Sequence, residues 1–320
     1  MKQALPDITL KAGEFQQINN VLTSNGLNVS QGFVKVERVG TAVAPYYAYA
    51  VITDQTTSDG SFVLHNYFKS QFGISRFTLP VAVEAGGFRT EVILTNATGI
   101  QRNVTLSYVA DAIQTSDHSA TLSLQLQPAE QRLIPDFVQY LRTQGVAGIG
   151  PDGSVFAGAI FATLGSGDPA FGQGFYMSAR TSIPGDGGYY GLHYPAVPEG
   201  QTAKTSAWLY GLQQNDENRT NLALINTGED DKSADVFDIE IYDGDLKNRV
   251  KTLEGITVNA RQWKQLNNLL AEAPGTLQGY ARVVRKSGTN PFVAYAVIND
   301  GAGPGQRSGD GAFIAMEKGD

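Results

Sequence analysis

The sequence contains no cysteine. Thiol catalysis, disulfide bonds and metal sites with cysteine ligands are therefore excluded. The chain also lacks any run of about 18 apolar residues, the length that a membrane-spanning helix needs. Basic residues are outnumbered 24 to 31, which gives a formal charge of −7. Because binding to phosphate requires a basic surface, this balance argues against a nucleic-acid-binding protein.

Charged residues of both signs are scarce. They make up 17% of the chain, against about 25% in ordinary soluble domains. Glycine, in contrast, occurs 36 times, and the apolar residues come in many short runs. This composition predicts an all-β protein with numerous turns, long enough for two or three domains.

Sequence motifs of common enzymes are missing as well. There is no GxSxG elbow, Walker A loop, HExxH motif or EF-hand loop. One GxGxxG match, Gly148–Gly153, is followed by strand-like residues where a dinucleotide site needs a helix, so we interpret it as a loop. The three histidines, His65, His118 and His193, have no recurring carboxylate or serine partner close in sequence. These observations predict a protein that is not an enzyme.

One ten-residue stretch occurs twice. Pro45–Asp54 (PYYAYAVITD) and Pro291–Asp300 (PFVAYAVIND) are identical at seven of ten positions, which indicates an internal repeat. Both faces of this stretch are apolar, and a strand without a polar face is normally covered on both sides. We therefore expect it to be a central strand in both copies.

The repeat extends to both sides of this stretch. Gln31–Arg38 (QGFVKVER) matches Gln278–Arg285 (QGYARVVR) and predicts a strand, as does Asp7–Leu10. Gln16–Leu22 matches Lys264–Leu270, and both have helical apolar spacing. These matches place the second half of one structural unit at the start of the chain.

Two further stretches open with Arg-Thr and close with Asn. They are Phe88–Asn96 (FRTEVILTN) and Asn218–Asn226 (NRTNLALIN). A helical turn is expected at Pro135–Leu141 between them, and Tyr189-Tyr190 is expected to match Phe313-Ile314. The pattern predicts tandem antiparallel β-sandwiches, Ig-like or similar, each with one short helical turn.

The predicted domains are residues 1–77, a partial repeat with its connector, and two complete sandwiches at 78–196 and 197–320. The partial repeat lacks its opening strands and should expose sheet edges, which proteins normally cover. We therefore expect it to dock on the neighbouring unit or to associate with another chain.

Repeated acidic residues form the first candidate site. Asp54 and Asp300 end the shared strand, whereas Asp59 and Asp310 lie in the shared Asp-Gly loop. Four carboxylates could supply the oxygen ligands that calcium prefers. Aspartate before glycine is also ordinary turn chemistry, and capping of turns is the interpretation we favour.

Aromatic residues form the second candidate site. Tyr189, Tyr190, Tyr194, Trp208 and Tyr210 gather near the junction of the two complete units. Exposed rings on a sandwich could form a flat platform for the faces of sugars. Packing in the contact between the units is the favoured alternative, because aromatic rings are usually buried.

The recurring RTxLxLxN and AYAVIxD patterns resemble the tandem β modules of large secreted or surface proteins of bacteria. The resemblance covers most of residues 7–316 and carries no catalytic residues. It implies an extracellular or cell-surface protein with a binding, adhesion or scaffold role, whose partner is a protein or a glycan. A carbohydrate-binding protein is the main alternative, and a glycoside hydrolase is a distant third. The first ten residues contain no apolar signal core.

Overall fold

The structure is a computed structural model that describes residues 3–27, 29–41, 43–65, 73–110, 119–165, 172–301, 307–308 and 310–319. The chain divides into two compact units, Met1–Ala48 and Tyr49–Asp320. His118 and Gly309 lie outside the described residues.

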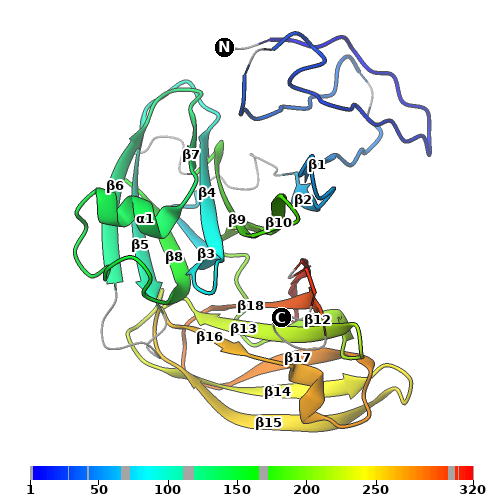
Figure 1. Ribbon diagram of the computed structural model, residues 1–320, viewed down its shortest axis with the longest axis vertical. Coiled ribbons are helices and arrows are strands. Elements are labelled where there is room, and N and C mark those ends of the chain that lie inside the picture. Colours follow the sequence, from blue (N-terminus) through cyan, green and yellow to red (C-terminus); the bar gives the residue numbers. More distant parts are fainter. Residues whose placement is uncertain are drawn as a thin grey trace. The chain divides into compact units, whose positions relative to one another are not determined.

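The unit Met1–Ala48 contains turns but no strand or helix among its described residues (Figure 1). The strands predicted at Asp7–Leu10 and Gln31–Arg38 are therefore wrong. The helix predicted at Gln16–Leu22 is also wrong, since the local hydrogen bonds form a turn further along, where the Ser24 N–H donates to the Asn20 carbonyl. The physical reason is that these segments have no strands to pair with, and short helices are unstable without a surface to pack on.

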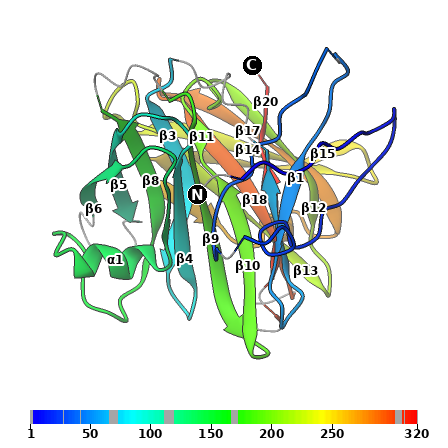
Figure 2. The same ribbon diagram turned by 90° about the horizontal axis from the view of Figure 1, so that it is seen from above.

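The larger unit contains two antiparallel β-sandwiches (Figures 1 and 2). The N-terminal sandwich consists of β3 (Arg76–Glu84), β4 (Arg89–Asn96), β5 (Arg102–Ala110), β6 (Ser119–Leu126), β7 (Gln131–Ile134), α1 (Phe137–Thr143), β8 (Phe156–Leu164), β9 (Phe175–Gly185), β10 (Gly188–Pro195) and β11 (Val197–Pro198). Its sheets have the orders β10-β9-β4-β7 and β11-β3-β8-β5-β6.

The C-terminal sandwich repeats this topology. It consists of β12 (Ser206–Gln213), β13 (Asn218–Asn226), β14 (Asp235–Asp243), β15 (Asn248–Val258), β16 (Trp263–Leu266), η3 (Leu269–Glu272), β17 (Gln278–Ser287), β18 (Phe292–Asp300), β19 (Gly311–Ala315) and β20 (Glu317–Lys318). Its sheets have the orders β16-β13-β18-β19 and β15-β14-β17-β12-β20. Each strand order matches that of the N-terminal sandwich strand for strand.

Alternating side chains of the two sheets fill each sandwich. In β14, residues at every second position from Asp235 to Asp243 are buried and the residues between them are half-exposed. The core of the C-terminal sandwich draws on both sheets, for example Leu222 and Leu224 of β13 against Phe237 and Ile239 of β14. The all-β sandwich predicted from the sequence is confirmed.

The repeated Arg-Thr and Asn residues complete backbone hydrogen bonding. Thr220 Oγ1 donates to the Gln213 carbonyl and accepts from the same residue's N–H, which ties β13 to the end of β12. Thr90 makes the same pair of bonds with Val83. The closing residues Asn96 and Asn226 are both fully buried, and their amides donate to backbone carbonyls across the sandwich.

The two predicted helical turns differ. Helix α1 forms as expected and begins after Asp136, whose carboxylate accepts from the Gln139 N–H at 3.1 Å. At the matching place in the C-terminal sandwich, Trp263–Leu266 pairs with β13 as strand β16, and only Leu269–Glu272 is helical, as a 3₁₀ turn. Sheet pairing therefore overrides the helical spacing of residues 264–266.

The repeated ten-residue stretch has two different structures. In the second copy, β18 lies between β13 and β19 with residues 292–297 buried, so the predicted central strand is confirmed. In the first copy, β1 (Tyr49–Thr53) has β2 (Gly60–Leu64) as its one partner among the described residues, and all five residues of β1 are exposed. The central strand predicted there is wrong, because no second strand of the described residues pairs with β1.

Strand register also corrects one sequence match. Gly191 lies opposite Ser182 in the β9–β10 hairpin as Gly311 lies opposite Asn299 in β18–β19. Phe313-Ile314 therefore corresponds to His193-Tyr194 and not to Tyr189-Tyr190. The two tyrosines belong to an extension of the β9–β10 hairpin, which ends in a two-residue Asp-Gly turn (Figure 2).

A third apolar cluster joins the two sandwiches. Ala159 and Phe161 of the N-terminal sandwich pack with Trp263, Val293 and Tyr295 of the C-terminal one. The Trp263 indole N–H donates to the Tyr295 hydroxyl at 2.9 Å, and both side chains are buried. The outer face of the five-stranded sheet in the first sandwich thus contacts the outer face of the four-stranded sheet in the second.

Loss of the closing asparagine should destabilise its sandwich. In Asn226→Ala, the carbonyls of Val258 and Ser233 and the N–H of Gly228 lose their buried partner. We expect the free energy of unfolding to fall by about 2–3 kcal/mol, as is usual for unsatisfied buried groups. Chemical denaturation measures the change. Asn218→Ala, at the half-exposed start of the same strand, is the control and should change stability by less than about 0.5 kcal/mol.

Candidate functional site

Asp54 and Asp300 cap equivalent loops. The Asp54 N–H donates to the Asp59 carbonyl at 2.8 Å, as the Asp300 N–H does to the Asp310 carbonyl at 2.9 Å. The N–H groups of Thr57 and Thr56 donate to the Asp54 carboxylate and lower its pKa. These contacts match the turn-capping interpretation.

The second loop is capped in the same way. The Ser308 hydroxyl donates to the Asp300 carboxylate at 2.6 Å and lowers its pKa. The same hydroxyl accepts from the Asp310 N–H at 3.2 Å, as the Thr57 hydroxyl does from the Asp59 N–H. The two loops therefore share their internal hydrogen bonds.

Asp310 lies near enough to Asp59 for the two charges to interact. Burial and the Asp59 charge raise the pKa of Asp310. Arg180 of β9 forms an ion pair with Asp59 at 3.1 Å. The Gly191 N–H of β10 donates to the same carboxylate at 2.7 Å. The positive charge beside Asp59 is therefore a guanidinium group.

Arg180 was not singled out in the sequence, because it occupies the place that Val297 has in the C-terminal sandwich. Its Nε donates to Ser61 Oγ at 2.9 Å, so one side chain contacts two residues of the β1–β2 hairpin and its loop. A Cβ on Gly191 would lie 2.8 Å from the Arg180 guanidinium, so glycine makes room for it. Among the described residues, no group of three or more acidic, histidine or cysteine side chains is placed to hold a metal ion.

The five aromatic residues of the second candidate site occupy separate places. Tyr194 is 7% exposed and packs edge-to-face on Tyr295 and Phe313, so it belongs to the contact between the sandwiches. Tyr189 is exposed, and the Tyr190 hydroxyl donates to Asp186 at 2.6 Å, which raises the tyrosine pKa.

Trp208 and Tyr210 lie instead on β12, in an aromatic cluster with Tyr242 of β14 and Tyr280 of β17. We call these four residues the aromatic face. They lie on the outer side of the five-stranded sheet, where residues alternate with the buried core. Tyr210 is 47% exposed. The sequence hinted at Tyr242 and Tyr280 only through the period-2 alternation of their strands.

The rings of the aromatic face form two stacked pairs. Tyr242 and Tyr280 are opposite each other in neighbouring strands, and their rings are parallel within 4° at 4.8 Å, the spacing between strands. Trp208 and Tyr210 are also parallel within 4°. The two pairs are tilted against each other, so the four rings form a compact cluster and not a flat platform.

Charged side chains flank the aromatic face. Arg282 lies over the Trp208 ring at 5.3 Å, a cation–π contact. Glu240 accepts from the Tyr242 hydroxyl at 3.0 Å and from Arg249 at 2.8 Å. Burial and the bond to Glu240 raise the pKa of Tyr242, which keeps its hydroxyl protonated. The face thus combines apolar rings with donors and acceptors of hydrogen bonds.

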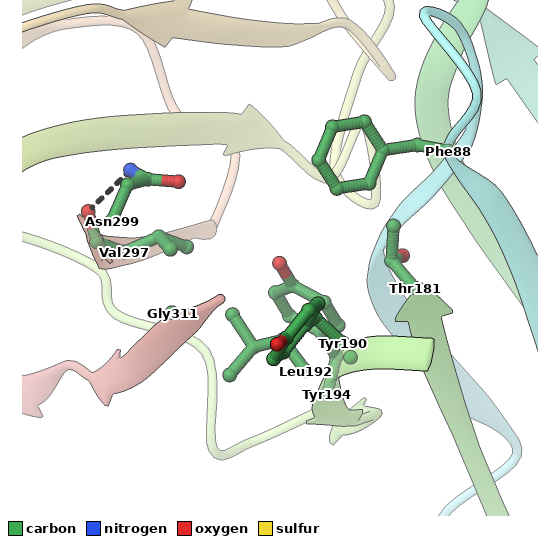
Figure 3. Close-up of a pocket in the computed structure, with 9 residues that line it drawn as sticks. Phe88, Thr181, Tyr190, Leu192, Tyr194, Val297, Asn299 and Gly311 are labelled. Atoms are coloured by element: carbon green, nitrogen blue, oxygen red, sulfur yellow. Dashed lines mark hydrogen bonds between the residues drawn. The ribbon is translucent and has the colours of Figure 1, made fainter. Parts of the chain in front are cut away.

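A small pocket lies where the hairpins of the two sandwiches meet (Figure 3). Phe88 and Thr181 line one side, and Val297 and Asn299 line the other, with Tyr190 between them. Its lining contains no carboxylate, histidine or lysine. His193 lies nearby in β10, where burial lowers its pKa to about 4 and keeps the ring uncharged at neutral pH.

Comparison of the chain with protein-family models gave no match, and the search of curated proteins gave none either. Among the described residues there is no helix with the length and apolar character that crossing a membrane requires.

The raised pKa of Asp310 and the lowered pKa of Asp300 predict opposite effects of removing each charge. A raised folded-state pKa contributes stability at low pH that is lost as the pH rises through that pKa. Asp310→Asn should therefore raise the melting temperature at pH 7, on the order of 1–2 °C, with the gain disappearing toward pH 4. The measurement is thermal unfolding followed by circular dichroism across this pH range.

Asp300→Asn is the matched variant. A carboxyl group whose pKa is lowered in the folded state stabilises the protein at pH values above the group's pKa in the unfolded state. The variant should lower the melting temperature at pH 7 and have little effect near pH 3. A shift of the same sign in both variants at pH 7 would contradict the assignment.

Proposed function

We propose that this protein is a non-enzymatic binding module, exported or displayed on a cell surface, and that it binds carbohydrate on the aromatic face. The observation that carries the proposal is the cluster of four aromatic rings, Trp208, Tyr210, Tyr242 and Tyr280, on the outer side of the five-stranded sheet. Sugars present apolar C–H faces beside hydroxyl groups, and this surface supplies partners for both.

The equivalent surface of the N-terminal sandwich supports this choice of ligand. There, Val109 takes the place of Tyr242, Ala159 that of Tyr280 and Phe161 that of Arg282, and all three pack in the apolar cluster between the sandwiches. This surface of the N-terminal sandwich is thus built from aliphatic and phenyl groups. The aromatic face replaces them with hydroxyl-bearing rings and charges, which suit a hydrated ligand better than a protein module.

Three groups have defined roles in the proposed complex. The Tyr210 ring, the most exposed of the four, packs on a C–H face of a sugar ring. Glu240 and Arg249 form hydrogen bonds with sugar hydroxyls at the edge of the cluster. Tyr280 and Tyr242 support the cluster from below by stacking on each other.

The full chain, screened on an array of plant, bacterial and animal glycans, should bind a defined set of oligosaccharides. Calorimetric titration of the best ligand should show Tyr210→Ala about tenfold weaker, the loss expected for one aromatic contact of ~1.4 kcal/mol. Tyr189→Ala, with a similarly exposed ring on β10, is the control and should bind as the parent does.

Absence of any reproducible glycan would overturn the carbohydrate assignment and favour a scaffold role. Equal binding by the parent, Tyr210→Ala and Tyr280→Ala would show that a ligand binds elsewhere.

A further inference from the structure

The β1–β2 hairpin reproduces the β18–β19 hairpin residue for residue. Val51 lies opposite Phe62 in the first, and the corresponding Val297 lies opposite Phe313 in the second. The loops match as well, since each begins and ends with the aspartate pair described above. Each sandwich has a first half, β3–β6 or β12–β15, and a second half that consists of the strands after it. The β1–β2 hairpin therefore has the structure of one hairpin from the second half of a sandwich.

The other edge of these hairpins differs. β18 pairs along nine residues with β13, Asn218–Asn226. β1, its counterpart, has β2 as its one partner in the described part of the chain. The residues of β1 are exposed, whereas residues 292–297 are buried. One edge and one face of the β1–β2 hairpin therefore lack the cover that β18–β19 has.

Matching valines show the same contrast within the unit Met1–Ala48. Val34 and Val36 are each 55% exposed, although their counterparts Ala281 and Val283 are fully buried. β17, which carries these counterparts, lies between β12 and β14. Residues 1–30 contain no match to those two strands.

Glycines at one repeated position show how closely a neighbouring strand passes. In β17, a Cβ added to Gly279 would lie 2.1 Å from the Tyr242 carbonyl oxygen of β14. In β8, a Cβ added to Gly158 would lie 1.9 Å from the Val109 carbonyl oxygen of β5. Both glycines are needed because a first-half strand passes closely. Gly32 occupies the same position, yet an added Cβ there would meet only a leucine methyl group at 3.7 Å. The lack of a side chain at Gly32 leaves the space that a closely passing neighbour strand would need.

We propose that residues 15–64 bind a partner polypeptide that carries first-half strands of this same sandwich type. By strand addition, a segment with the Arg-Thr to Asn pattern of β4 and β13 pairs with the edge of β1 that is opposite β2. A counterpart of β14 pairs with residues 31–38, which then form a strand.

A second copy of this chain is not the proposed partner. Its two sets of first-half strands, β3–β6 and β12–β15, are already paired with their own second halves. Donating either set would unfold one of its sandwiches. A separate polypeptide with unpaired first-half strands has no such cost.

The test adds to the full chain a probe polypeptide with the sequence of residues 203–259, which contains β12–β15, diluted from urea. Size-exclusion chromatography with light scattering should show a one-to-one complex. Hydrogen exchange followed by mass spectrometry should become at least tenfold slower at residues 31–38 and 49–53. A probe with Leu222→Asp and Leu224→Asp, which places charges in the core, should give neither result.

Two variants of the chain localise the contact. Val36→Asp should abolish the complex, because its counterpart Val283 is a core residue. Val39→Asp is the matched control and should leave binding unchanged, since its counterpart Lys286 is exposed. Both valines are more than half exposed in the free chain, so neither change should disturb folding.

The proposal is overturned if the parent probe gives no complex and no protection, or if the charged probe protects equally. Protection that arises without the probe, together with dimers of the chain, would overturn it in favour of a second copy.

Discussion

In each sandwich, the strands of the second half depend on the strands of the first half for their hydrogen-bonding partners. In the C-terminal sandwich, β17 lies between β12 and β14, and β16 and β18 both pair with β13. Within the second half itself, only β18 and β19 pair with each other. Because backbone N–H and C=O groups need partners, the second half alone can form just one hairpin. The beginning of this chain shows that result, with the β1–β2 hairpin as its one pair of strands in the described residues.

The same dependence explains which features were visible in the sequence. The threonine of the RTxLxLxN motif bonds to the end of the preceding strand, and the asparagine bonds to a carbonyl that is distant in sequence, and both residues recur in the two sandwiches. The strand at Pro291–Asp300 was predictable because both of its faces are apolar. Its first copy, with nearly the same residues, is exposed. Local sequence therefore gives the preference for a strand, and the neighbouring strands decide whether its faces are buried.

The candidate sites show a different limit. Asp59 and Asp310 were recognisable as equivalent residues of two matching loops, but Arg180 breaks the repeat and leaves no periodic signal. Tyr242 and Tyr280 join Trp208 only because β12, β17 and β14 are adjacent in the sheet, an order that the sequence does not contain. Side chains that recur at fixed positions could thus be found beforehand. Those brought together by strand order could not.

The contacts of the β1–β2 hairpin leave its pairing edge available. It is held on the N-terminal sandwich by the Asp59–Arg180 ion pair and by the hydroxyls of Thr57 and Ser61, which donate to carbonyls of β10. These groups belong to the loop and to β2, and none lies on β1. The hairpin is therefore anchored by polar contacts at one side, while the apolar strand that a sandwich would bury at its centre stays exposed.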